Sequence, residues 1–165
     1  MKLETIWKTA ERVWEHTARE VASLAQRIQP EQFLAAAALI TECKGKVITT
    51  GTGTSGAAAK KVAHTLSCVE RPALFLSPAD AVHGGLGVVQ PEDLVILFSK
   101  GGKTRELAAL IPSLETKGCK TLAVTENENS PLALRATALL KVYVSGEPDP
   151  FDMLATSSTA AVIAT

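Results

Sequence analysis

Hydrophobic residues recur along this chain at two spacings, which predict helices in some segments and strands in others. Over residues 3–28, apolar side chains return every three or four positions with charged residues between them, a pattern typical of one amphipathic helix of about seven turns. Pro30 suits the first turn of a second helix, which we expect to run to Cys43. Beyond it, short apolar runs rich in β-branched residues predict buried strands.

Strands then alternate with helices along the rest of the chain. Because most of the strands are continuous apolar runs, we expect a parallel sheet that is covered by helices on both faces. The predicted fold is a doubly wound α/β sandwich whose five parallel strands have the order 2-1-3-4-5. The expected strands lie between Gly45 and Gly51 and at residues 73–76, 94–99, 121–125 and 138–144, and the expected helices lie at residues 57–69, 103–117, 131–136 and 154–165.

The chain divides into a helical segment, residues 1–45, and a sheet domain, residues 46–165. With 165 residues it can bury a substantial core. No sheet face is reserved for the long first helix, so we expect that helix to pack on the sheet domain or, preferably, on a neighbouring subunit of a homo-oligomer such as a dimer or tetramer. We expect the last helix to be truncated, because no end signal precedes Thr165.

Charge and cysteine content disfavour several classes of partner. Lys plus Arg equal Asp plus Glu at 17 each, so the net charge favours neither nucleic acid nor a membrane surface. Cys43, Cys68 and Cys119 are odd in number and widely separated, and we expect them to be reduced, small buried hydrophobes. The N-terminus does not resemble a signal peptide, and no apolar run reaches the length of about 18 residues that a membrane span needs. We therefore expect a cytoplasmic protein without a bound metal or cofactor.

A glycine-rich turn, Gly51-Thr-Gly-Thr-Ser-Gly56, follows the first strand and is the most informative stretch of the sequence. It leads into a helix, whose unpaired N–H groups and dipole favour an anion such as a phosphate. The glycine spacing also fits a dinucleotide fingerprint, but the acidic residue that would end the second strand is missing, since Glu70 precedes that strand. A tight turn without a ligand is the remaining alternative.

A second loop of the same kind, Ser99-Lys-Gly-Gly-Lys-Thr104, follows the third strand. In the predicted sheet the two loops meet at the topological switch point, where doubly wound folds usually bind ligands. Ser55, Ser99 and Thr104 can then surround one phosphate together with nearby N–H groups, and Lys100 or Lys103 can add positive charge.

These two loops resemble the phosphosugar loops of the SIS (sugar isomerase) domain. Three further features are similar to the KpsF/GutQ group of D-arabinose-5-phosphate isomerases: the segment Pro78-Ala-Asp-Ala-Val-His-Gly-Gly-Leu-Gly87, the residue Glu147 and the segment Ala155-Thr-Ser-Ser-Thr159. Two positions depart from the family pattern, because Thr54 replaces its usual lysine and Lys103 replaces its usual glutamate. The CBS modules common in longer members are also absent from this sequence.

The resemblance implies interconversion of D-ribulose 5-phosphate and D-arabinose 5-phosphate through an enediol, with no metal or cofactor. It implies Glu147, and after it Glu106, as the proton-transfer carboxylate, and His83 as a group for ring opening or for polarising the carbonyl. Lys103 is the expected cation. The expected contacts to substrate and phosphate are Gly53, Thr54, Ser55, Ser99, Lys100, Gly101, Thr104, Thr156 and Ser157.

Other interpretations stay open from the sequence. Isomerisation of another sugar phosphate is one, and a non-catalytic phosphosugar-sensing domain is another, favoured by the departures at Thr54 and Lys103. Glu106 also suits the first turn of a helix for purely structural reasons. His16 and His64 fall on predicted helices, and we interpret both as structural.

Overall fold

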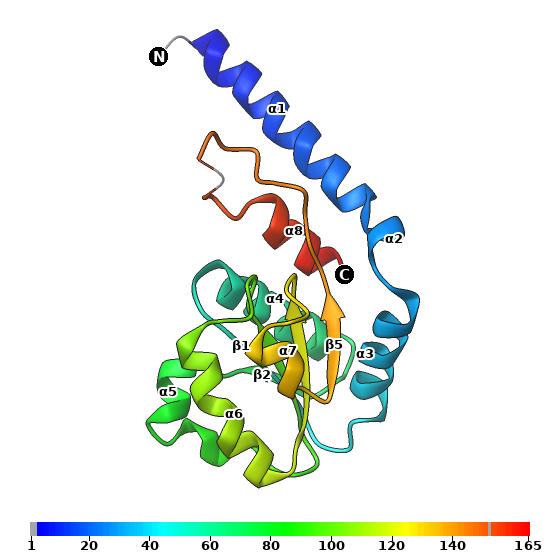
Figure 1. The fold of residues 1–165 in the computed structure, drawn as a ribbon, viewed down its shortest axis with the longest axis vertical. Helices are drawn as coiled ribbons and strands as arrows, with labels where there is room; N and C mark the ends of the chain where they lie inside the picture. Colours follow the sequence, from blue (N-terminus) through cyan, green and yellow to red (C-terminus); the bar gives the residue numbers. More distant parts are fainter. Residues whose placement is uncertain (1–2, 152) are drawn as a thin grey trace.

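A computed structural model describes residues 3–151 and 153–165, and it shows one parallel sheet between two layers of helices (Figure 1). The strand order is β2-β1-β3-β4-β5, as predicted from the sequence. All paired strands are parallel, and in the middle of the sheet Ile96 lies between Thr49 and Leu122. The strands are β1 (Val47–Gly51), β2 (Ala73–Phe75), β3 (Leu94–Phe98), β4 (Lys120–Thr125) and β5 (Ala138–Lys141).

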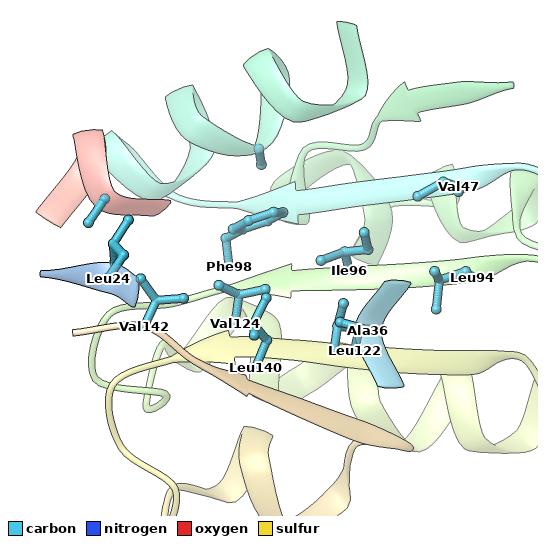
Figure 2. Close-up of a cluster of buried hydrophobic side chains, with 12 residues drawn as sticks. Leu24, Ala36, Val47, Leu94, Ile96, Phe98, Leu122, Val124, Leu140 and Val142 are labelled. Carbon is cyan, nitrogen blue, oxygen red and sulfur yellow. The ribbon is translucent and has the colours of Figure 1, made fainter. Parts of the chain in front are cut away.

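Alternate side chains of the central strands supply two separate cores. Ile96 and Phe98 face one layer of helices (Figure 2), whereas Val95 and Leu97 face the other. This arrangement explains why β3 is apolar at every position, since both of its faces are buried. The first layer contains α3 (Pro30–Glu42), α4 (Gly53–Cys68) and α8 (Ser157–Ala164), and the second contains α5 (Pro78–Val82), the 3-10 helix η1 (Gly85–Val88), α6 (Arg105–Lys117) and α7 (Pro131–Arg135).

The long N-terminal helix packs against the first layer over part of its length and extends beyond the sheet with the rest (Figure 1). α1 (Leu3–Ala22) lies beside α8 and then projects beyond the sheet (Figure 1). On the projecting half, Trp7 and Trp14 pack edge to face with their ring centroids 5.7 Å apart, yet each is more than half exposed. The apolar stripe predicted for this helix is therefore largely uncovered within one chain.

Several element boundaries differ from the predicted ones. The first helix is interrupted at Ser23, whose hydroxyl donates to the Glu20 carbonyl at 2.7 Å, and it resumes as α2 (Leu24–Arg27). β5 stops at Lys141, because β4, which pairs with it, ends opposite at Thr125. α8 starts at Ser157, not at residue 154, and α6 starts at Arg105, not at residue 103.

Two short helices between β2 and β3 were not predicted, because α5 and η1 are too brief to show a periodic pattern. Cys119 is buried, as expected, but Cys68 is exposed near the end of α4, which corrects the expectation that it is a buried hydrophobe. Among the described residues no helix is long and apolar enough to cross a membrane.

Candidate functional site

A pocket opens at the carboxyl ends of β1, β3 and β4, where both glycine-rich loops leave the sheet. β1 and β3 are adjacent, and the chain passes to opposite faces of the sheet after them, so the pocket lies at the predicted topological switch point. One part of the lining comes from the two loops and another from the start of α8. The lining residues used below are Thr54, Ser55, Ser99, Lys100, Tyr143 and Ser158.

The first loop is itself the opening turn of α4, which begins at Gly53 and not at the predicted residue 57. Gly53 has φ +54°, a conformation that favours glycine, and the Gly56 N–H donates to the Thr52 carbonyl at 3.0 Å. A side chain at Gly56 would also collide with the Gly51 carbonyl. The tight turn places Thr54 and Ser55 in the pocket wall, at the positive end of a 16-residue helix.

The second loop is held closed by its own hydroxyls. Ser99 is buried, and its Oγ lies 2.8 Å from the Thr104 Oγ1 and accepts from the Gly102 N–H at 3.1 Å. The Lys100 carbonyl accepts from the Thr125 hydroxyl at 2.8 Å and from the Glu126 N–H at 3.0 Å. These bonds fix the loop backbone and leave the Lys100 side chain at the pocket.

Glu147 carries a buried carboxylate that binds the first turn of α8. Its oxygens accept from the N–H groups of Thr156, Ser157 and Ser158 at 2.9, 2.7 and 3.2 Å, and from the Ser158 hydroxyl. The Lys100 Nζ lies 3.7 Å from the Glu147 Oε1. Thus one carboxylate joins the second loop, α8 and the pocket wall.

The structure therefore brings Thr54, Ser55, Ser99, Lys100 and Glu147 to one place. Of the other predicted contacts, Thr104 reaches it through Ser99, and Thr156 and Ser157 reach it through their N–H groups. Gly53 and Gly101 shape the two loops without lining the pocket.

All four predicted catalytic residues lie outside the pocket lining itself, but Glu147 contacts Lys100 and Ser158, which belong to the lining. His83 is exposed at the end of α5, and Lys103 and Glu106 are exposed at the start of α6. Their roles stay predictions. Ser158 and Tyr143 line the pocket but were not predicted as site residues, although Ser158 belongs to the segment 155–159 that resembles the family. Among the described residues no cluster of three or more His, Cys, Asp or Glu side chains could hold a metal ion.

Comparisons with known proteins give a consistent result. The SIS domain profile matches residues 39–165. KpsF of Escherichia coli O6:H1, named arabinose 5-phosphate isomerase, is 39% identical over 142 residues, which cover 86% of this chain and 43% of that protein. GutQ of Escherichia coli K12, with the same activity in its name, is 40% identical over 141 residues, which cover 86% of this chain and 44% of GutQ. The chain thus spans less than half the length of these relatives.

Two solved structures match almost the whole chain. A Listeria monocytogenes protein described as a candidate sugar-phosphate isomerase is 49% identical with a TM-score of 0.97, and the match covers 99% of this chain and 86% of that one. An Escherichia coli CFT073 protein in complex with arabinose 5-phosphate is 29% identical with a TM-score of 0.93, and the match covers 99% and 86% of the two chains.

Proposed function

Because the chain belongs to the SIS domain family, we propose that it is an aldose–ketose isomerase of a sugar phosphate, with D-ribulose 5-phosphate and D-arabinose 5-phosphate as its preferred pair. The names of the KpsF and GutQ relatives and the arabinose 5-phosphate bound to the Escherichia coli CFT073 structure support this substrate class. The observation that carries the proposal is the meeting of two hydroxyl-rich loops at one pocket, with the buried carboxylate of Glu147 behind two residues of its wall, Lys100 and Ser158.

The substrate phosphate would lie between the two loops. Ser55 offers a hydroxyl at the start of α4, and the hydroxyls of Ser99 and Thr104 already face each other at 2.8 Å. Charge-assisted hydrogen bonds from hydroxyl and N–H groups suit a phosphate dianion. The sugar would then extend toward Glu147 and the wall that contains Tyr143.

Isomerisation requires a proton to move between C1 and C2 through an enediol, and we assign this step to Glu147, whose carboxylate lies beside the pocket residues Lys100 and Ser158. Its side chain is 1% exposed, and four hydrogen bonds from the start of α8 fix its orientation. The proton would pass from one sugar carbon to a Glu147 oxygen and from there to the neighbouring carbon.

Lys100 would stabilise the negative charge that develops on the enediol oxygens. Lys100 is the one lysine or arginine among the described residues that line the pocket. In this arrangement the second loop supplies the cation, and Thr54 in the first loop contributes a hydroxyl. We favour Lys100 over Lys103 for this role, because the Lys103 side chain is exposed outside the pocket lining.

We also propose that the protein self-associates through the projecting half of α1. Leu3, Ile6, Trp7 and Trp14 are between 44% and 83% exposed on one helix, an apolar area of the kind usually covered by another subunit. A second copy of the chain, as a dimer or tetramer, would cover it. We place the assembly in the cytoplasm, where the three unpaired cysteines would stay reduced.

One observation favours a second candidate function, a phosphosugar-binding domain without catalysis. Glu147 binds the first N–H groups of α8 in the way that a capping carboxylate does, so it can serve structure alone. Such a domain would bind a sugar phosphate at the same loops but would exchange no carbon-bound hydrogen.

A coupled assay of the purified protein against a panel of pentose and hexose phosphates tests the proposal. We expect turnover with the ribulose and arabinose 5-phosphates and slower or no turnover with hexose phosphates. The control is Glu147→Gln, which keeps the shape of the side chain and removes its basic oxygen. Equal activity in this variant would remove Glu147 from proton transfer.

A further inference from the structure

The loop that leads to Glu147 is held in place by the N-terminal helix. After β5 ends at Lys141, residues 142–147 leave the sheet and run beside α1 (Figure 1). The Glu20 carboxylate accepts from the Ser145 N–H at 2.9 Å and also from the Ser145 hydroxyl. The His16 Nε2 lies 2.9 Å from the Gly146 carbonyl oxygen. Because that oxygen only accepts, the His16 Nε2 must carry the hydrogen.

The same turn of α1 also contacts the start of α8, which binds Glu147. The Thr17 Oγ1 lies 3.0 Å from the Ser157 Oγ, and the Ser157 N–H donates to the Glu147 Oε2 at 2.7 Å. His16, Thr17 and Glu20 lie within one turn, so their side chains reach the loop and α8 from one helix face. Glu147 is therefore held between two segments that α1 fixes.

Glu20 is buried, and its hydrogen bonds and ion pair hold α1 against the loop of residues 142–147. Its side chain pairs with Arg27, whose guanidinium lies 5.2 Å from the ring centre of Tyr143, a residue of the pocket wall. Burial alone would raise the pKa of Glu20, but the hydrogen bonds from Ser145 and Arg27 outweigh it and lower the pKa to about 2. Glu20 is thus ionised near neutral pH, and its charge is balanced within the same cluster.

We propose that His16, Thr17 and Glu20 are positioning residues that hold Glu147 in its working orientation. They lie outside the pocket lining, so they act through the backbone of residues 145–147 and through Ser157. The proposal rests on the proposed function insofar as Glu147 moves a proton. Its geometric part, the clamp of α1 on the Glu147 loop, can be measured without turnover.

Hydrogen–deuterium exchange and kinetics on single variants test this proposal. In His16→Ala and Thr17→Val, amide exchange in peptides covering residues 142–149 and 155–160 should accelerate about tenfold, because the amides bound by Glu147 open more often. The kcat should fall about ten- to a hundredfold, whereas KM and the Kd for the phosphosugar should stay within about twofold, because the phosphate loops are untouched. His16→Gln, which places an amide N–H near the same carbonyl, should recover most of the loss.

Thr116→Val is the matched control, because Thr116 is exposed on α6, away from α1, and its hydroxyl donates within its own helix, to the Pro112 carbonyl. It should leave both exchange and kcat unchanged. Unchanged exchange in His16→Ala and Thr17→Val would overturn the clamp, whatever the activity. Faster exchange with unchanged kcat would overturn the positioning role alone. If exchange is faster in these variants but the wild type itself lacks isomerase activity, the proposed function is refuted. The contact of α1 with the Glu147 loop is then still supported.

Discussion

Replacing Lys100 with methionine should slow isomerisation about thirtyfold while substrate affinity changes little. As the proton moves to Glu147, the negative charge passes to the enediol oxygens of the sugar. The Glu147 carboxylate already receives hydrogen bonds from α8, whereas Lys100 is the cation that the pocket lining offers to the sugar. The attraction of Lys100 therefore grows as the transition state forms.

The geometry sets the size of this effect. The Lys100 Nζ lies 3.7 Å from the Glu147 Oε1, and an enediolate within hydrogen-bond reach of Glu147 would lie at a comparable distance. Two unit charges at that separation attract by about 4 kcal/mol at an effective dielectric constant near 20. The Lys100 side chain is 43% exposed, so solvent screening removes roughly half and leaves about 2 kcal/mol. This energy corresponds to a rate change of about thirtyfold.

Steady-state kinetics with D-arabinose 5-phosphate would measure the effect. Lys120→Met is the matched control, because Lys120 is exposed at the opposite end of β4. Adding Thr54→Lys to the Lys100→Met variant should restore part of the kcat, since position 54 lines the same pocket from the first loop. A Lys100→Met enzyme with wild-type kcat and a raised KM would refute the reasoning, because it would assign Lys100 to phosphate binding alone.

Three further predictions follow from the same structure. Ser55→Ala should weaken phosphosugar binding by about 1–2 kcal/mol through loss of a charge-assisted hydrogen bond, and unchanged affinity by calorimetry would remove the phosphate from this loop. The double variant Trp7→Glu and Trp14→Glu should convert the oligomer to a monomer in light scattering. A wild-type protein that is already monomeric at micromolar concentration would refute self-association through α1. The pKa of Glu20 falls from 4.5 to about 2 on folding, so its contribution to the free energy of unfolding is complete above pH 4.5 and is lost as the pH falls toward 2. Glu20→Gln should therefore flatten the acid branch of a denaturation curve measured between these pH values, and an unchanged slope would contradict this.

Most of the fold was predictable because each strand and long helix has a strong local pattern. β3 is buried on both faces and consequently apolar throughout, and α4 and α6 follow loops with glycine and hydroxyl signals. The break in the first helix at Ser23 was not predictable from the sequence. Serine also occurs within uninterrupted helices, and the bond from the Ser23 hydroxyl to the Glu20 carbonyl is visible only in the structure. The length of β5 depends on where β4 ends, which is a tertiary property.

The two loops rich in glycine and hydroxyl groups were predictable for the same local reason, but the surroundings of Glu147 were not. Its contacts to Ser157 and Ser158 join residues about ten positions apart through a helix start that no periodicity fixes. His16 was interpreted as structural because it falls on an amphipathic helix, and its contact with Gly146 spans 130 positions of the chain. Sequence spacing carries no signal for such a contact, which depends on how α1 packs against α8.

The most direct test of the isomerase proposal is an NMR measurement of wild-type protein with D-ribulose 5-phosphate in deuterium oxide. We predict that D-arabinose 5-phosphate forms and carries deuterium at C2, because the proton passes through Glu147 and exchanges with solvent there. Calorimetry on the same sample should show phosphosugar binding. Binding without aldose formation and without deuterium at C1 or C2 would contradict the isomerase proposal and favour a binding domain.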